Sequence, residues 1–358
     1  MTQPVIALLG RRDEPTDAVE EYCRYLGAAL RAHDTQLEIR RVPWELRGWS
    51  EALRGLRLQA ESWRDTWVLV QYTALAWSAR GFPQRIFRAL RILKSARARI
   101  AIVFHDVEPY HGTHLIDKFR IIMQIRTMRR AVAFADLAIF TVPPEKLSWR
   151  PKVGPRVAFV PVGPNLPIPP EIPDRAAQVS VPTIAVFSIT GGEKGETRLI
   201  LDAVRHAAEN VGELRLSVFG RHAELRERDL RNGLRGLPVE ISVEGVIDPP
   251  QVVARFLACD VLLFVRGGIS SRRGSAIAGI ACGLPLIAFC GSETAPPITE
   301  AGVILLAPDA VEELKAALVR VLRDSAYREE LASRSRAAYQ AHFAWPVIAS
   351  RFAALLRH

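Results

Sequence analysis

The sequence predicts an α/β protein with two doubly wound domains, each built on its own parallel sheet. Three observations predict this fold class. Short apolar runs alternate with helix-like patterns along the 358 residues, a proline-rich stretch interrupts the alternation near the middle, and the alternation then starts again. The length also fits two domains, because a domain usually holds on the order of 100–200 residues.

In the first half, one predicted strand at residues 100–104 reads IAIVF and is apolar throughout. A continuous apolar run is typical of a parallel strand that is buried on both faces. Alternation of such strands with helices predicts βαβ units. The predicted strands span 5–9, 37–42, 67–71, 100–104, 137–141 and 157–161, and the predicted helices span 17–32, 83–98 and 114–133.

Six prolines lie between Pro161 and Pro173. Proline interrupts both helices and strand ladders, so this stretch predicts an interdomain linker. We therefore expect an N-terminal domain at 1–163, a linker at 164–180 and a C-terminal domain at 181–342.

The second half repeats the pattern and opens with a strand and a glycine-rich turn. Because ligands of open α/β sheets bind beyond the carboxyl ends of the strands, two facing sheets predict a substrate cleft between them. The predicted strands span 183–187, 214–219, 239–244, 261–265, 285–289 and 303–306, and the predicted helices span 197–210, 250–258, 275–282, 310–323, 327–341 and 346–356.

Composition excludes several classes of protein. Hydrophobic residues make up 49% and charged residues 24%, which is typical of a folded chain. No apolar run approaches the ~20 residues of a membrane span. The four cysteines show no CxxC spacing and predict buried free thiols in a reducing cytosol. The net charge of +10 favours a solvated basic face or attraction to an anionic substrate or membrane, and no motif indicates nucleic-acid binding.

The turn SITGGEKGE joins the strand at 183–187 to the next helix. Gly191 and Gly192 allow backbone N–H groups to approach an anion, and Lys194 supplies a positive charge for a phosphate. The turn is not a Walker A loop, since the last glycine follows the lysine. An ordinary strand–helix turn with a surface lysine is the alternative.

The segment RGGISSRRGSAIAGIACGLP follows the strand at 261–265. Its glycine pair at 267–268 predicts a loop, and small residues predict a helix that packs closely. Guanidinium groups beside a helix N-terminus favour a diphosphate site, although a tightly packed helix with a basic start is the alternative. The donor-phosphate candidates are Arg272, Arg273, Gly274 and Ser275.

Two further segments follow strands of the first half. FHDVEPYHGTH places His105 and Asp106 after the apolar strand, where a histidine contacts a sugar or phosphate or transfers a proton. GRRDEPTD places Arg11 and Arg12 after the first strand, while Asp13 or Thr16 is expected to cap the next helix. A hydrogen-bonded loop histidine and a plain helix cap are the alternatives, and the histidine spacing matches no closed zinc site.

These motifs together resemble glycosyltransferase family 4 and its relatives over nearly the whole chain. The resemblance rests on the order of several short motifs along the chain. These are the loop after the first strand, His105-Asp106, PVGPN at 161–165, Lys194-Gly195, ACGLP at 281–285 and FAW at 343–345. It implies the GT-B architecture, two Rossmann-like domains facing a central cleft, with the segment 343–358 forming a helix that returns to the N-terminal domain.

The resemblance also implies an activity. It indicates a retaining, metal-independent transfer of a sugar from a nucleoside-diphosphate sugar, UDP- or GDP-linked, with no other cofactor. Catalytic roles fall on His105, Lys194 and Arg273, and nucleoside contacts fall on Arg221 and Val246. The remaining sugar or acceptor contacts fall on Arg11, Arg12, Asp106, Gly268, Ile269 and Ser270.

The sequence departs from the family at two glutamates of the site helix. Their positions fall on Ser270 and Ala278, and the family's arginine before the lysine falls on Ile189. This departure leaves open a non-catalytic sugar-nucleotide-binding subunit and a GT-B sugar-nucleotide epimerase. We expect a cytoplasmic protein whose acceptor is a small molecule, a glycan or a lipid-linked glycan. The basic stretch at 115–130 suggests peripheral contact with the inner face of the membrane.

Overall fold

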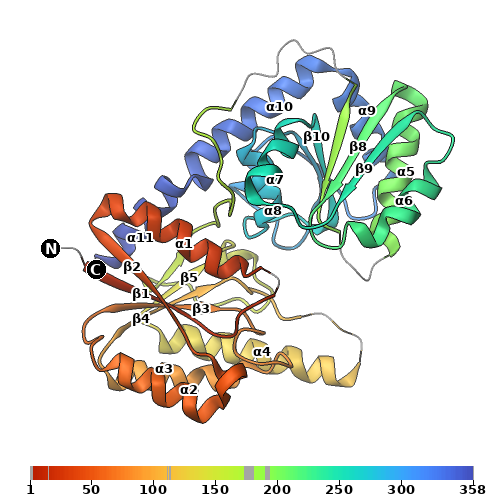
Figure 1. The fold of residues 1–358 in the computed structure, drawn as a ribbon. Coiled ribbons are helices and arrows are strands. Elements are labelled where there is room, and N and C mark those ends of the chain that lie inside the picture. The colour runs from red at the N-terminus through yellow and green to blue at the C-terminus, as the bar shows by residue number, and fades with distance from the viewer. Residues whose placement is uncertain are drawn as a thin grey trace. The chain divides into compact units, whose positions relative to one another are not determined.

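The computed structural model describes residues 3–14, 16–110, 112, 114–172, 181–189 and 194–357. The chain forms two compact units, drawn in Figure 1. Unit 1 combines Met1–Val162 with Trp345–His358, and unit 2 is Gly163–Ala344. The last helix therefore belongs to the unit formed by the N-terminal half, as the fold class predicted.

Unit 1 contains a six-stranded sheet in the order β2-β1-β3-β4-β5-β6, and every neighbouring pair is parallel. Its central strands are buried along their length, because helices cover both faces. The strands are β1 (Gln3–Leu9), β2 (Thr35–Arg41), β3 (Trp67–Tyr72), β4 (Arg99–Phe104), β5 (Leu137–Phe140) and β6 (Val157–Phe159).

The helices of unit 1 lie on two sides of this sheet (Figure 1). Side chains of α2, α3 and α4 share one apolar core with alternate residues of the strands. Helices α1 and α11 contact each other on the opposite side, where Trp345 stacks on Tyr25 at 5.7 Å between ring centroids. These helices are α1 (Ala18–Leu30), α2 (Trp44–Ala60), α3 (Ile86–Ser95), α4 (Leu115–Phe134) and α11 (Trp345–Leu356).

One long-range hydrogen bond fixes the end of the chain in unit 1. The indole Nε1 of Trp67, the first residue of β3, donates to the carbonyl oxygen of Leu356 at 2.7 Å. A buried indole N–H needs such a partner, so the bond ties the last turn of α11 to the sheet.

Unit 2 contains a second six-stranded parallel sheet in the order β12-β11-β10-β7-β8-β9. Its strands are β7 (Thr183–Phe187), β8 (Leu214–Phe219), β9 (Val239–Glu244), β10 (Val261–Gly268), β11 (Leu286–Phe289) and β12 (Val303–Leu306). Its helices are α5 (Lys194–Val211), α6 (Glu227–Gly233), α7 (Pro249–Leu257), α8 (Gly274–Ala281), α9 (Val311–Arg323) and α10 (Ser325–Ala338).

Helix α2 was absent from the sequence prediction. Its sequence, WELRGWSEALRGLRLQA, includes two glycines, and Gly48 has φ 72°, which interrupts the helix. The apolar stripe of Ala52, Leu56 and Ala60 is narrow and spaced by four residues. Such a helix depends on packing against its sheet rather than on local preference. Helix α6 was also not predicted, and it is only seven residues long.

Candidate functional site

In unit 2, the carboxyl end of β10 leads through a short loop into α8, and this connection carries the predicted phosphate-binding residues. Arg266 Nη2 donates a hydrogen bond to Ser275 Oγ in the first turn of α8. Gly274 is the first residue of that helix. Free backbone N–H groups and the helix dipole make such an N-terminus favourable for anions.

The carboxylate of Glu293, which no sequence motif indicated, binds Arg272. Arg272 Nε and Nη2 donate to Oε2 and Oε1 of Glu293 at 2.6 and 2.7 Å. Ser270 Oγ donates to the same Oε2 at 3.0 Å. Burial alone would raise the pKa of Glu293, but the hydrogen bonds and charge of Arg272, with Ser270, lower it. The loop after β11 therefore supplies a carboxylate to Ser270, one of the two positions where acidic residues were expected and not found.

Arg266 and Arg273 form no ion pair with any residue that the structure describes, and the Nε atom of each is buried without a hydrogen-bond partner. Burial, together with the charges of Arg272 and Arg266 and against that of Glu293, lowers the pKa of Arg273 to about 10. Burial also lowers the pKa of Arg266, against the charge of Glu196. Both guanidinium groups stay cationic at neutral pH, so this corner of unit 2 is electropositive.

The glycine pair at 267–268 does not form the predicted loop. These residues are the last two of β10, and Gly268 pairs with Phe289 of β11 after an irregularity in register. The prediction was wrong because glycine usually marks a turn, whereas here it extends a strand.

The glycines allow two backbones to touch at this point. A Cβ on Gly268 would lie 2.5 Å from Gly291 Cα. Thr294 Oγ1 donates to the carbonyl oxygen of Ile269 at 2.6 Å and accepts from Gly291 N at 2.8 Å. This close approach brings the loop that carries Glu293 against the loop that carries the arginines.

The glycine-rich turn before α5 is described only in part. Gly191 and Gly192 lie outside the described residues, and Lys194 is described as the first residue of α5 but not by its side chain. Glu196, in the first turn of α5, is buried, and its charge acts on Arg266. The start of α5 therefore lies near the arginine cluster, while the phosphate-binding role of the turn stays a prediction.

The two residues assigned to the nucleoside lie at neighbouring strand ends. Ile189 N donates to the carbonyl oxygen of Arg221 at 3.0 Å, beyond β7 and β8. Gly220 N donates to the carbonyl oxygen of Gly245 at 2.9 Å, next to Val246, whose side chain is exposed. Arg221 and Val246 thus border the same edge of the sheet as the arginines, and a nucleoside role stays a prediction.

In unit 1, a cavity of about 220 Å³ lies at the carboxyl edge of the sheet. The loop after β1, the start of α1 and the loops after β3 and β4 line it. Two predicted site residues, Arg11 and Asp106, contribute to its walls, and so does Asp13 in the loop after β1. Arg12 is not among the lining residues and is exposed, 3.7 Å from Glu14.

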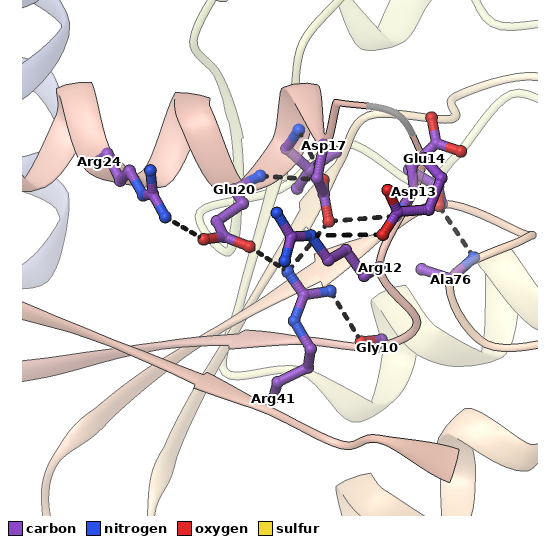
Figure 2. A network of polar contacts seen from close by, with 11 residues as sticks. Gly10, Arg12, Asp13, Glu14, Asp17, Glu20, Arg24, Arg41 and Ala76 are labelled. Atoms are coloured by element: carbon purple, nitrogen blue, oxygen red, sulfur yellow. Dashed lines mark hydrogen bonds and ion pairs between the residues drawn. The ribbon is translucent and has the colours of Figure 1, made fainter. Parts of the chain in front are cut away.

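Asp17 organises the loop after β1 (Figure 2). It caps α1 by accepting from Val19 N and Glu20 N, each at 3.1 Å, so the cap is neither Asp13 nor Thr16 as predicted. Asp17 is buried, and Arg41 Nη2 compensates its charge at 3.0 Å; the same guanidinium binds Glu20 at 2.6 Å. The fold, not the local sequence, selects the capping residue, since Arg41 comes from the end of β2.

Arg11 is held at the cavity rim by two contacts. Its backbone N donates to the carbonyl oxygen of Ala76 at 2.8 Å, and its Nη1 lies 3.4 Å from Glu45. A Cβ on the preceding Gly10 would lie 2.1 Å from that same Ala76 oxygen. Only glycine fits there, so the loops after β1 and β3 are locked together at the cavity.

His105 is a neutral, fixed imidazole. Its Nε2 lies 2.8 Å from Gln71 Oε1, while Gln71 Nε2 donates to the carbonyl oxygen of Leu69 at 3.1 Å. These two hydrogen bonds fix the orientation of the Gln71 amide, so its oxygen accepts from Nε2 of the imidazole. Nδ1 of the imidazole is left as an acceptor. Burial lowers the pKa of His105 to about 4, against the charge of Asp17. The residue therefore accepts or donates hydrogen bonds without a positive charge at neutral pH.

Asp106 is held by the loop after β3 and by its own loop. Its Oδ2 accepts from Ala74 N and from Tyr110 OH, both at 2.8 Å. Gln71, Asp106 and Tyr110 all line the cavity. A buried glutamine inside the apolar strand WVLVQY was the sequence signal for this cluster, and it was missed.

Within the part of the chain that the structure describes, no group of three or more His, Cys, Asp or Glu residues is placed to hold a metal ion. His114 instead caps α4 together with Asp117, and His111 lies outside the described residues. Among the described helices, none combines the length and apolarity needed to cross a bilayer.

No protein-family model matches the chain, and no curated protein matches it in sequence. Solved structures match it over its full length. Sucrose-phosphate synthase from Thermosynechococcus elongatus is 19% identical, with a TM-score of 0.67 over 99% of this chain and 98% of that chain. Anabaena HepE, solved with UDP and glucose, is 15% identical, with a TM-score of 0.64 over 98% of this chain and 99% of that chain.

The lipopolysaccharide outer core galactosyltransferase WaaB is 12% identical, with a TM-score of 0.62 over 99% of this chain and all (100%) of that chain. At these identities the likeness concerns the fold. It confirms the predicted fold class, two Rossmann-like parallel-sheet domains of the GT-B type.

Proposed function

We propose that the protein is a glycosyltransferase that moves a sugar from a nucleoside-diphosphate sugar to an acceptor. The electropositive corner of unit 2 carries the proposal. There, Arg266 and Arg273 lack carboxylate partners among the described residues, beside a helix N-terminus that begins at Gly274. A diphosphate is the ligand class whose charge and oxygen geometry suit guanidinium groups and free backbone N–H groups.

The proposed mechanism uses these groups on the leaving diphosphate. As the glycosidic bond breaks, negative charge grows on the nucleoside diphosphate and positive charge on the sugar ring. Arg273, the amides of Gly274 and Ser275, and Lys194 would stabilise the growing negative charge. Groups that are already oriented and partly desolvated act most strongly, which matches the burial of Arg273.

In unit 1, we assign the cavity of about 220 Å³ to part of the acceptor. Carboxylates and the Tyr110 hydroxyl on its walls suit hydroxyl groups of a polyol or sugar. His105 does not line the cavity, so its neutral imidazole would act through Gln71, its hydrogen-bond partner on the wall, rather than bind a phosphate. HepE and WaaB, the one solved with UDP and glucose and the other named as a galactosyltransferase, support this assignment of function.

Retention of configuration, metal independence and a UDP- or GDP-linked donor are parts of the same proposal, and they rest on the resemblance to glycosyltransferase family 4. Proton NMR of the product would report the anomer, and activity in EDTA would report metal dependence. An inverted product or complete loss in EDTA would contradict these parts without touching the transferase assignment.

The deciding experiment is a thermal-shift screen with nucleoside diphosphates and their sugars, followed by assays of donor hydrolysis and transfer. A ligand that binds only the folded protein raises the melting temperature. We expect a shift with one nucleotide and slow hydrolysis of its sugar conjugate. Binding without turnover over a broad acceptor panel would indicate a binding subunit, turnover of the donor to an isomer would indicate an epimerase, and no shift with any nucleotide would overturn the proposal.

A further inference from the structure

We propose that the solvent face of α3 and α4 in unit 1 binds the surface of an anionic lipid bilayer, with the first two turns of α4 entering the headgroup layer. The first observation is a stripe of exposed apolar side chains. Leu115, Phe119 and Ile122 are spaced by four and three residues, so they share one face of the helix. Their exposed fractions are 83%, 54% and 47%, and Ile116 beside them is 52% exposed.

These residues are not part of the unit's core. The core takes its α4 contribution from the other end of the helix, through Met128 and Ala131. Figure 1 shows the helix extending past the strands of its sheet. Clustered large apolar side chains in water mark an interaction site more often than scattered ones do.

The second observation is the charge around the stripe. Residues 80–134 contain twelve Lys or Arg and three Asp or Glu. The three acidic residues are all engaged, Asp106 by Tyr110, Glu108 by Ser148, and Asp117 by Arg120. The exposed cations of the two helices are Lys118, Arg126, Arg129 and Arg130 on α4, and Arg88, Arg91 and Lys94 on α3.

The cations of α3 and α4 belong to one surface because the two helices are neighbours. The guanidinium of Arg130 lies 4.4 Å from the centre of the Phe87 ring, and Phe134 lies 6.4 Å from the same ring. In α3, Arg88, Arg91 and Lys94 follow a spacing of three residues; Arg88 and Arg91 border a groove shared with Glu61 at the end of α2, and Lys94 forms an ion pair with Asp136 at 3.3 Å. We call this surface, with the apolar stripe, the α3–α4 face.

The combination favours a membrane over the other polyanion, nucleic acid. Cationic side chains by themselves would attract either partner, since both a bilayer of anionic lipids and a nucleic acid carry negatively charged phosphates. Aliphatic side chains such as Leu115 and Ile122 gain free energy by leaving water for acyl chains, and they gain nothing from a sugar–phosphate backbone. A helix with apolar and cationic residues on one exposed face therefore fits an anionic bilayer.

The test is co-sedimentation of the full chain with vesicles of phosphatidylcholine alone or with 30 mol% phosphatidylglycerol, roughly the charge density of an anionic leaflet. We expect binding to the anionic vesicles and a steep loss as the salt concentration rises. Replacing Arg91, Lys118 and Arg126 by Gln should lower the partition coefficient about a hundredfold, or about fivefold for each cation. Phe119→Ser with Ile122→Ser should lower it about tenfold or more.

The matched controls remove the same number of charges or apolar side chains from parts of the surface outside the α3–α4 face. Arg228, Arg231 and Arg235 are exposed in unit 2, and their triple change to Gln removes the same charge. Val153 and Leu225 are 67% and 61% exposed and serve as the apolar control pair. Both controls should bind vesicles like the unchanged protein, and circular dichroism should show that every variant is folded.

Each other result overturns the proposal. Absence of binding to anionic vesicles at low salt removes it directly, and so does equal binding to vesicles without charge. Equal loss in the charge control would show that only net charge matters. Unchanged binding in the Phe119→Ser, Ile122→Ser variant, together with retention by duplex DNA, would assign the face to a soluble polyanion. No nucleotide sugar enters the assay, so its outcome is independent of the proposed transferase activity.

Discussion

Arg272 and Glu293 form a two-point ion pair, with Nε and Nη2 of the guanidinium donating to both carboxylate oxygens at 2.6 and 2.7 Å. The pair links the loop before α8 to the loop after β11, and Ser270 joins it through a 3.0 Å hydrogen bond. It gives the candidate donor site a fixed wall. Because Arg272 is already paired with a carboxylate, Arg273 and Arg266 are the two guanidinium groups of this corner that have no carboxylate partner among the described residues.

The first prediction concerns this pair. Glu293→Gln should lower the free energy of unfolding by about 1–3 kcal/mol, because a partly buried guanidinium loses its carboxylate. A double-mutant cycle with Arg272→Ala should give a coupling energy of about 1–3 kcal/mol. Glu312→Gln is the control, since Glu312 pairs with Lys315 in an exposed ion pair and its loss should leave stability almost unchanged. Equal costs for the two substitutions in urea unfolding would contradict the assignment.

The same carboxylate predicts a dependence of stability on pH. The pKa of Glu293 is lower in the folded protein than its ordinary value. Its stabilising effect is therefore complete above the unfolded pKa of about 4.3 and is lost as the pH falls through the folded value. Unfolding of the unchanged protein and of Glu293→Gln should be compared between about pH 5 and pH 3. A parallel loss of stability in both proteins would show that Glu293 is not perturbed.

The second prediction concerns Arg273. Arg273→Ala should reduce turnover by about 10²–10³-fold if its charge acts on the leaving diphosphate, and Lys194→Ala should act similarly. The stability of Arg273→Ala should change little, because its Nε is buried without a hydrogen bond and no described residue forms an ion pair with it. Arg228→Ala, an exposed arginine of α6, is the control. Full turnover by both site variants with the true donor would remove these residues from the mechanism.

The third prediction concerns His105. Its pKa is lowered to about 4 by burial, so the folded protein resists protonation that the unfolded chain accepts near pH 6.5. Stability should therefore fall by roughly 2–3 kcal/mol as the pH drops from about 6.5 to 4, and level off below that. His105→Gln should lack this slope, and His206, a half-buried histidine of α5, serves as a control in His206→Gln. A ¹H–¹⁵N titration that finds His105 protonated at pH 6 would contradict the prediction.

The fourth prediction concerns the contact of two glycines. Gly268→Ala places a Cβ 2.5 Å from Gly291 Cα, where backbone meets backbone, so the melting temperature should fall by several degrees. Gly274→Ala at the start of α8 is the control, because nothing lies within 4 Å of its added Cβ. Its melting temperature should stay the same or rise. Equal melting temperatures for the two variants would mean that the loops move apart without cost.

The neutral state of His105 and the ion pair of Arg272 do not follow from the sequence alone. Both residues were identified as candidates from their places after apolar strands. Their states depend on Gln71 and Glu293, which are 34 and 21 residues away along the chain. Register and loop packing set such pairs, so a polar residue inside an apolar strand, such as Gln71, indicates that a partner exists but not which residue it is.

The two parallel-sheet units follow from the sequence alone, because each apolar run is long enough for a strand buried on both faces and the prolines separate the runs into two groups. The sequence also placed the arginines, Lys194 and His105 beyond strand ends. The folded chain sets which carboxylate meets Arg272 and which aspartate caps α1, and it makes Gly268 the end of a strand. These depend on contacts between distant segments, where the free energy of packing outweighs local preference.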